Sequence, residues 1–297
     1  MRLPMANKHR IPLLLIFLLF SAAAGAQEYA LVLAGGGGKG AYQVGVWKAL
    51  TDYGIAQKVT AISGTSVGGL NAALFACADV KQAERIWKEQ VPSCLTKDDA
   101  LISQEGLQQI IGSIDLSAMQ RHPFPRVTVT AVRNRYKILK ALTVPSPGEY
   151  AHRFTLNDEG STKEIAKELL ATSAFPVICQ PVELADGYRY IDGGAEALGG
   201  DNVPVAPVLQ ECPSVSTIIV VYLDDEQHIS RRIKKIDYDA YSVLEIIPSI
   251  NLSRYILEGT TNFTENRIQL LITQGYEDTA EVLRKQGLYP VSSWWFE

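Results

Sequence analysis

The sequence predicts an α/β protein in which strands alternate with helices along the chain. An apolar run of strand length at residues 29–34 is followed by a glycine-rich loop and by a helical pattern at 41–50. A second unit has the same order, with a strand that ends near residue 62, a sharp turn, and a Leu- and Ala-rich helix at 67–78. A third apolar run at 216–223 has the length of a buried strand. This alternation favours a central, mostly parallel sheet.

The N-terminus has the features of a secretory signal peptide. Basic residues near the start precede an apolar run at 11–26 that ends in Ala24-Gly25-Ala26. The run is short compared with the ~20 residues that a membrane-spanning helix needs. We therefore expect residues 1–26 to be removed and the mature protein to be periplasmic or secreted. With 297 residues in all, 47% of them hydrophobic, residues 27–297 can form one domain with a sizeable core.

The charge of the mature chain argues against a nucleic-acid partner. The full chain has 28 Lys and Arg and 32 Asp and Glu, and the signal peptide contains three of the basic residues. Removal of the signal peptide leaves 25 basic and 32 acidic residues, a net charge of −7. Proteins that bind nucleic acids generally present a basic surface, so we expect none as a partner.

The cysteines leave two interpretations open. An even number of cysteines in an exported chain is compatible with disulfides, and four cysteines allow three pairings. A domain of this size does not need disulfides, so buried free thiols fit equally well. Their spacing resembles no zinc site. The four are Cys77, Cys94, Cys179 and Cys212.

Residues 64–68 predict an exposed nucleophile. The sequence Gly64-Thr-Ser66-Val-Gly68 lies between the end of a strand and the start of a helix. In a nucleophile elbow, glycines at these two positions remove Cβ atoms where the arms of the turn crowd together, and the serine hydroxyl is exposed above the sheet edge. A glycine-rich helix start with a capping serine is the other interpretation. Only a partner for Ser66 can decide between them.

The first glycine-rich loop fits two functions. In a dinucleotide site, such a loop lets a pyrophosphate approach the helix N-terminus, and the next strand ends near an acidic residue. The next strand here ends in Ser-Gly-Thr-Ser and has no acid. In an oxyanion hole, successive amides backed by a helix dipole face the oxygen that becomes negative. We expect this second function for Gly35, Gly36, Gly37, Gly38, Lys39 and Gly40.

The middle of the chain adds helices and strands. Residues 80–112 are helical in pattern, with a break predicted at Pro92. Residues 126–132 and 136–142 alternate well enough to predict paired strands. A helix predicted at 161–173 begins with Ser-x-x-Glu, a capping box.

A candidate base follows a strand predicted at residues 188–191. Asp192-Gly193-Gly194 stands at its end, and glycine at the two following positions allows a tight turn that brings the carboxylate close to another loop. An ordinary β-turn would have the same Asp-Gly sequence. Asp192 is the missing partner that Ser66 needs.

The C-terminal part is less informative. Acidic residues at 224–226 follow the strand at 216–223 and fit either a metal site or a solvated loop. The basic run at 231–235 either contacts anionic headgroups or is simply exposed. Helices are predicted at 238–257, broken at a proline, and at 263–286, which makes a helical part of about 238–297.

As an ordered set, these motifs resemble the patatin-like phospholipase family. The set comprises the glycine loop, the serine turn, Ala-Thr-Ser-Ala-Phe-Pro at 171–176 and the Asp-Gly-Gly, and it spans about residues 29–207. The resemblance implies a three-layer α/β/α fold and lipid acyl hydrolysis by a Ser-Asp dyad without histidine. It assigns the nucleophile to Ser66 and the proton acceptor to Asp192. Ala34 departs from the Asp or Ser that many members have before the glycines, which leaves this assignment untouched.

We therefore expect an acyl hydrolase of the phospholipase A or lysophospholipase type. Its partners would be an acyl lipid and, peripherally, a membrane or lipid aggregate, and no metal or cofactor is expected. One alternative is a Ser-His-Asp esterase, for which His228 alone follows Asp192 in the chain. Others are a dinucleotide-binding protein and a lipid-binding protein without activity.

Overall fold

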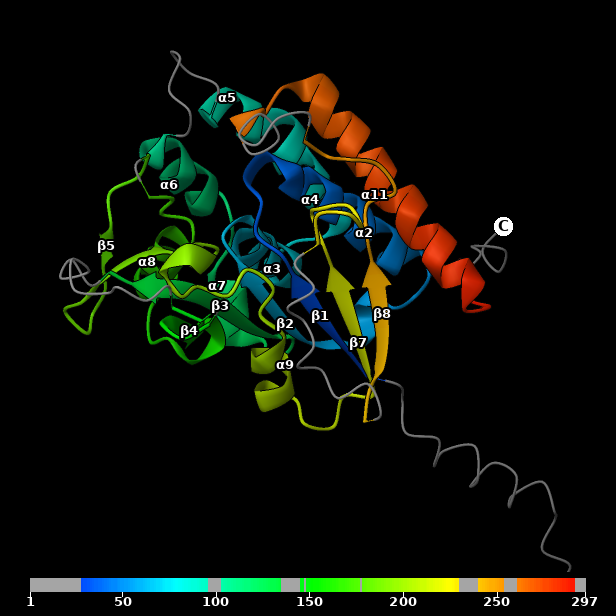
Figure 1. The fold of residues 1–297 in the computed structure, drawn as a ribbon, viewed down its shortest axis with the longest axis horizontal. Coiled ribbons are helices and arrows are strands. Elements are labelled where there is room, and N and C mark those ends of the chain that lie inside the picture. Colours follow the sequence, from blue (N-terminus) through cyan, green and yellow to red (C-terminus); the bar gives the residue numbers. More distant parts are fainter. Residues whose placement is uncertain are drawn as a thin grey trace, which may run out of the picture.

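Within the part of the chain that the structure describes, eight strands form a mixed, mostly parallel sheet at the centre (Figure 1). The structure is a computed structural model that describes residues 28–95, 103–134, 145–146, 148–176, 178–229, 240–253 and 261–291. The order across the sheet is β5-β6-β3-β2-β1-β7-β8, and β4 pairs with β3. The strands are β1 (Tyr29–Leu33), β2 (Val59–Thr65), β3 (Arg126–Arg133), β4 (Ala151–Thr155), β5 (Val182–Glu183), β6 (Arg189–Asp192), β7 (Thr217–Val221) and β8 (Ser242–Ile246).

Five neighbouring strands, β3, β2, β1, β7 and β8, run in the same direction. In their register Leu33 at the end of β1 lies beside Gly64 of β2 and Val221 of β7. The carboxyl ends of these strands therefore meet at one edge, and the loops that follow β1, β2 and β7 leave the sheet there together. Ligand sites of open α/β sheets lie at this edge.

Helices cover both faces of the sheet (Figure 1). Leu31 and Leu33 of β1 join the larger core, together with residues of the helices that follow β1 and β2 and of the last long helix. Ala30 and Val32 belong to a separate core on the opposite face. Successive side chains of a strand point to opposite faces, so the buried strand β1 separates two helical layers. The predicted three-layer α/β/α fold is confirmed.

The described helices are mostly short, apart from the last one. Among them, α2 and α3 follow β1 and β2, as predicted, and α9 lies on the face that Ala30 and Val32 contact. Their bounds are α2 (Ala41–Asp52), α3 (Val67–Cys77), α4 (Val80–Arg85), α5 (Val91–Leu95), α6 (Gln104–Gly112), α7 (Ser117–Arg121), α8 (Thr162–Thr172), α9 (Val205–Glu211) and α11 (Glu265–Lys285).

Several local predictions are confirmed. Ser161 of the predicted capping box caps α8, because its hydroxyl accepts a hydrogen bond from the Glu164 backbone N–H at 3.2 Å. The strands predicted at 126–132, 188–191 and 216–223 are β3, β6 and β7, and the helix predicted at 263–286 is α11. The structure describes all four cysteines, and each is a free thiol.

The helix predicted at 238–257 is wrong over its described part. Ser242–Ile246 forms strand β8, which extends the sheet in parallel beside β7. Leu244 and Ile246 are buried whereas Glu245 between them is exposed, the alternation of a strand with one covered face. A short apolar run fits both the helical and the strand period, and packing on β7 decides in favour of the strand.

The break predicted at Pro92 is also wrong. From α4 the chain continues through a π-helical turn at Ile86–Gln90 directly into α5, whose second residue is Pro92. Proline removes a backbone donor and usually clashes with the preceding turn of an α-helix. The wider π turn just before it is the local change that accommodates Pro92.

Three predicted features lie outside the described residues: the signal peptide at 1–26, the strand at 136–142 and the basic run at 231–235. For the residues that are described, no helix combines the length and the apolar character needed to cross a membrane.

The carboxyl of Glu168 on α8 allows a test of how burial in this fold affects stability. This carboxyl is buried, its Oε2 has no hydrogen-bond partner among the described residues, and burial, followed by nearby Glu159, raises its pKa to about 9. The folded pKa lies above the ordinary 4.5, so this group's contribution to stability is complete below about pH 4.5 and falls as the pH rises toward 9. Glu168→Gln should therefore raise the Tm by several degrees at pH 8 and by much less at pH 5 in thermal melts.

The exposed Glu277→Gln is the control for Glu168→Gln, because it removes the same charge from the surface of α11. It should change the Tm little at either pH. An equal gain in Tm for Glu168→Gln at pH 5 and pH 8 would contradict the prediction.

Candidate active site

Ser66 stands on a strained turn between β2 and α3. Its backbone angles are φ 55° and ψ −127°, and it is the one non-glycine residue with positive φ in the described part of the chain. Such a conformation costs on the order of 1–3 kcal/mol and persists only where neighbouring structure imposes it. A Cβ at Gly64 would lie 2.2 Å from the carbonyl oxygen of Gly68, and one at Gly68 would lie 2.3 Å from that of Leu33. Only glycine fits at either position, so the turn is an elbow.

Asp192 lies at hydrogen-bond distance from Ser66. The Ser66 hydroxyl donates to Asp192 Oδ2 at 2.6 Å, although the two residues are 126 positions apart in the chain. Asp192 ends β6 and is buried, and its Oδ1 accepts a hydrogen bond from the backbone N–H of Gly194 at 2.7 Å. A Cβ at Gly193 would lie 2.1 Å from the carbonyl oxygen of Thr130, so the turn after Asp192 also requires a glycine. The two motifs that the sequence singled out are thus in contact.

Burial changes the acidity of Asp192. Loss of solvent raises the pKa of its carboxyl to about 6, against the lowering effect of the hydrogen bonds from Ser66 and Gly194. A carboxylate with a higher pKa is a stronger base, and it is still ionised at neutral pH. The pair can therefore transfer a proton from the serine hydroxyl to the carboxylate as a bond to the serine oxygen forms.

The glycine loop is buried in its second half and borders a cavity along its first half and at Lys39. Gly38, Lys39 and Gly40 are buried in a 3₁₀ turn that leads into α2, and Gly35, Gly36, Gly37 and Lys39 border a cavity. The backbone N–H of Gly35 already donates to the carbonyl oxygen of Asn202 at 3.2 Å. The N–H groups of Gly36 and Gly37 have no acceptor among the described residues. Gly37 has φ 57°, a conformation that glycine adopts at little cost.

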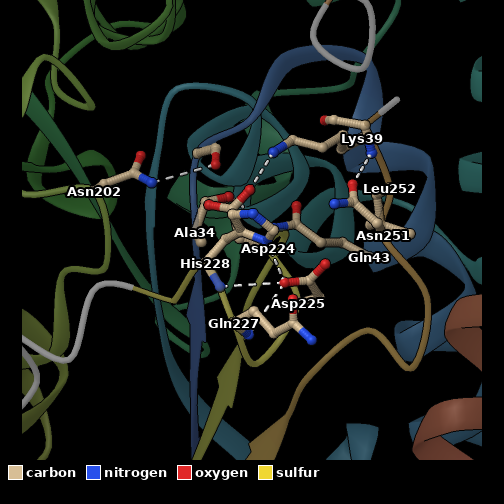
Figure 2. A network of polar contacts seen from close by, with 12 residues as sticks. Ala34, Lys39, Gln43, Asn202, Asp224, Asp225, Gln227, His228, Asn251 and Leu252 are labelled. Carbon is tan, nitrogen blue, oxygen red and sulfur yellow. Dashed lines mark hydrogen bonds and ion pairs between the residues drawn. The ribbon is translucent and has the colours of Figure 1, made fainter. Parts of the chain in front are cut away.

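A buried polar network holds this loop in place, and the sequence did not predict it. Gln43 donates to the carbonyl oxygen of Ala34 at 2.8 Å, as Figure 2 shows, and Asn71 donates to that of Gly40 at 3.0 Å. Asn71 also accepts a hydrogen bond from the Trp87 indole at 2.8 Å. Buried polar groups that are satisfied in this way fix the conformation of the backbone they contact.

Two further residues position the turn and the loop. Thr172 at the end of α8 accepts a hydrogen bond from the Ser66 backbone N–H at 2.9 Å and donates to the carbonyl oxygen of Thr130 at 2.5 Å. The Asn202 side chain donates to the carbonyl oxygen of Gly35 at 3.4 Å (Figure 2). Thr172 lies in the Ala-Thr-Ser-Ala-Phe-Pro stretch that the sequence singled out, although its contacts were not predicted, and nothing in the sequence identified Asn202.

The acidic stretch after β7 reaches the site through Asp224. Its Oδ1 lies 2.6 Å from the ammonium nitrogen of Lys39, and both residues border the cavity (Figure 2). Asp225 instead accepts a hydrogen bond from its neighbour His228, at 2.5 Å between Oδ1 and Nδ1. The His228 side chain is 59% exposed. The Ser66 hydroxyl donates to a carboxylate directly, and the hydrogen bonds found for His228 are with Asp225.

An apolar cavity of about 250 Å³ opens above Ser66 and Asp192. Its apolar wall comes mainly from α3, from the π-helical turn and the α5 helix that follows it, and from α6, with Phe263 just before α11. The apolar side chains that line it are Val67, Leu70, Leu74, Ile86, Trp87, Val91, Leu95, Leu107, Ile110, Ile114, Phe175 and Phe263. Such a wall accepts hydrocarbon rather than a charged nucleotide.

A three-layer α/β/α fold with a serine elbow, a buried carboxylate and an apolar cavity defines a protein of the lipase and esterase class. The chain belongs to the patatin-like phospholipase family, whose model matches residues 31–209. The resemblance that the motifs indicated over about residues 29–207 is thereby confirmed.

Solved structures with a similar course of the chain include VipD from Legionella pneumophila, at 14% identity and a TM-score of 0.49. The match covers 87% of this chain and 67% of VipD. The ExoU-SpcU complex from Pseudomonas aeruginosa matches at 17% identity and a TM-score of 0.39, over 88% of this chain and 52% of the matched chain. This protein thus spans about half the length of that chain. A comparison with curated protein sequences found no significant match.

Proposed function

We propose that the protein hydrolyses fatty acyl esters of lipids, of the phospholipase A or lysophospholipase type, with Ser66 as nucleophile and Asp192 as base. The observation that supports this most directly is the 2.6 Å hydrogen bond between the Ser66 hydroxyl and Asp192 beside an apolar cavity. The cavity suits an acyl chain, and family membership makes a lipid ester the natural substrate. Contact with a membrane or a lipid aggregate would be peripheral.

In this mechanism, Asp192 accepts the Ser66 proton while Oγ attacks the ester carbonyl carbon. The carbonyl oxygen becomes negative and accepts hydrogen bonds from the backbone N–H groups of Gly36 and Gly37, which have no other acceptor among the described residues. The alcohol leaves with the proton held by Asp192, and an acyl-enzyme remains at Ser66. Asp192 then takes a proton from water, which attacks the acyl carbon, and returns that proton to Ser66 Oγ as the bond between Oγ and the acyl carbon breaks and the fatty acid is released.

The raised pKa of Asp192 predicts the pH dependence. The base must be ionised, and burial raises its pKa to about 6, so kcat/KM should rise with pH to a plateau with a midpoint near 6. Initial rates on a neutral ester, measured between pH 4.5 and 8, would show this midpoint. A rate that stays constant between pH 5 and 7 would contradict this role for Asp192.

A fluorophosphonate probe and short-chain nitrophenyl esters test the proposed function on purified mature protein. Labelling at Ser66 with turnover of the esters is expected, and both should be lost in Ser66→Ala. Ser93→Ala, which removes an exposed hydroxyl that does not border the cavity, should retain both. Absence of labelling and of turnover in the wild type would leave a lipid-binding protein without activity as the better description.

We further propose that the protein is exported and that its signal peptide is cleaved after Ala26. The basic start, the short apolar run and Ala24-Gly25-Ala26 support this. Mass spectrometry of the mature species should find an N-terminus at Gln27, and membrane-bound protein that retains residues 1–26 would indicate a signal anchor instead.

A further inference from the structure

The ion pair between Lys39 and Asp224 places two opposite charges next to each other on the cavity wall. The ammonium nitrogen and Oδ1 are 2.6 Å apart and join the glycine loop to the loop that follows β7 (Figure 2). Among the described residues that line the cavity, Lys39 is the only basic one, and Asp192 and Asp224 are the only acids. The cation of this site is therefore already neutralised by a neighbouring carboxylate.

The two charges lie at different depths. The Lys39 side chain is 8% exposed, and its Cε lies 2.9 Å from the point where a Cβ at Gly36 would stand. The cation is thus held against the glycine loop, close to where an ester carbonyl would bind. The Asp224 side chain is 45% exposed, so its carboxylate faces the solvent side of the pair. Outward from the loop, the wall presents first a positive charge and then a negative one.

We propose that the Lys39–Asp224 pair selects lipids with a zwitterionic headgroup over lipids with an anionic headgroup. This inference rests on the proposed function, because it places the scissile ester at Ser66. In a phosphoethanolamine or phosphocholine lipid the phosphate is near the glycerol esters, and the ammonium group is two carbons farther out. The phosphate would then lie toward Lys39 and the ammonium toward Asp224.

An anionic headgroup meets the same wall less favourably. Phosphatidylglycerol has a phosphate but no ammonium group, so nothing in it compensates Asp224 when the phosphate approaches Lys39. Like charges at short distance in a partly buried site repel strongly. A site with an unpaired lysine would favour the anionic lipid, and Asp224 reverses that preference.

The test compares kcat/KM for phosphatidylethanolamine and phosphatidylglycerol with identical acyl chains, each in micelles of the same neutral detergent. We expect the wild type to prefer phosphatidylethanolamine by about tenfold. Asp224→Asn should reduce this preference to about twofold or less, through faster hydrolysis of phosphatidylglycerol. Glu226→Gln is the matched control, because it removes the same charge from an exposed residue of the same loop that does not border the cavity, and its ratio should equal that of the wild type.

Two results would overturn the inference. One is a wild-type ratio of kcat/KM for phosphatidylethanolamine to that for phosphatidylglycerol that is near one or below one. This result can be obtained without any variant. The other is an unchanged ratio in Asp224→Asn and in Asp224→Ser, with both lipids affected equally, which would mean that the pair only connects the two loops. Wild-type turnover of nitrophenyl esters distinguishes failure of the headgroup inference from failure of the proposed function. If these esters are hydrolysed and the ratio is near one, only the headgroup inference fails. Without any ester turnover, the proposed function fails and the inference fails with it.

Discussion

Asp192→Asn is expected to lower kcat/KM by about a thousandfold or more, as loss of one member of a catalytic set does in serine hydrolases. The carboxylate now accepts hydrogen bonds at both oxygens, from Ser66 at Oδ2 and from Gly194 at Oδ1. An asparagine has only one oxygen. If that oxygen keeps the Gly194 bond, the amide NH₂ group faces Ser66 and cannot accept its proton. Stopped assays with a nitrophenyl ester would measure the loss.

Two control variants make this result specific. Asp278→Asn changes another buried acid, which accepts a hydrogen bond from Tyr42 on α2 and does not border the cavity. It tests whether loss of stability alone lowers the rate. His228→Ala removes the histidine of the triad alternative and should stay within a few-fold of wild type. If His228→Ala instead loses as much activity as Ser66→Ala while it remains folded by circular dichroism, a histidine-based mechanism replaces the direct Ser-Asp pair.

The sequence predicted the parts of the site that local backbone geometry dictates. The crowding at Gly64 and Gly68 shows why the elbow needs glycine at both positions, and the Thr130 carbonyl shows the same for Gly193. A requirement for glycine at fixed spacing is visible in one sequence, because no other residue fits without a clash. The strand, turn and helix around Ser66 could therefore be predicted before any contact was known.

What the sequence did not predict depends on contacts between distant segments. Asp224 reaches the site because it follows β7, whose carboxyl end lies beside that of β1, whereas Thr172 reaches it from the end of α8 and Asn202 from the loop before α9. The sequence marked the stretches that contain Thr172 and Asp224, but no local pattern indicated which groups these side chains contact, and none marked Asn202. The prediction of a helix where β8 lies failed for a related reason. The apolar residues there fit both the helical and the strand period, and packing on the neighbouring β7 decides in favour of the strand.

Gly37→Val is expected to lower kcat by about a hundredfold or more while the protein still folds, which is the loss found when one oxyanion donor is removed. Gly37 has φ 57°, and a β-branched residue is strongly disfavoured there. The backbone can relieve this strain by rotating the peptide, which turns the N–H of residue 37 away from the carbonyl oxygen. Since that bond is stronger in the transition state than in the ground state, kcat should fall more than KM changes.

Gly287→Val is the matched control for backbone strain. Gly287 has φ 74°, and a Cβ there would have no neighbouring atom within 4 Å. It follows α11 and does not border the cavity. Valine there has a similar conformational cost, so a similar loss of Tm with full activity is expected.

Gly36→Val extends the test to the second donor, where a Cβ would lie 2.9 Å from Leu223 Cδ1. The N–H groups of Gly36 and Gly37 are the two amides of the loop's cavity-lining part that have no acceptor among the described residues. We expect Gly36→Val to lower kcat as well, measured with the same nitrophenyl ester. Unchanged kcat in both Gly36→Val and Gly37→Val would exclude the glycine loop as the group that stabilises the oxyanion, because both available amides would then be dispensable.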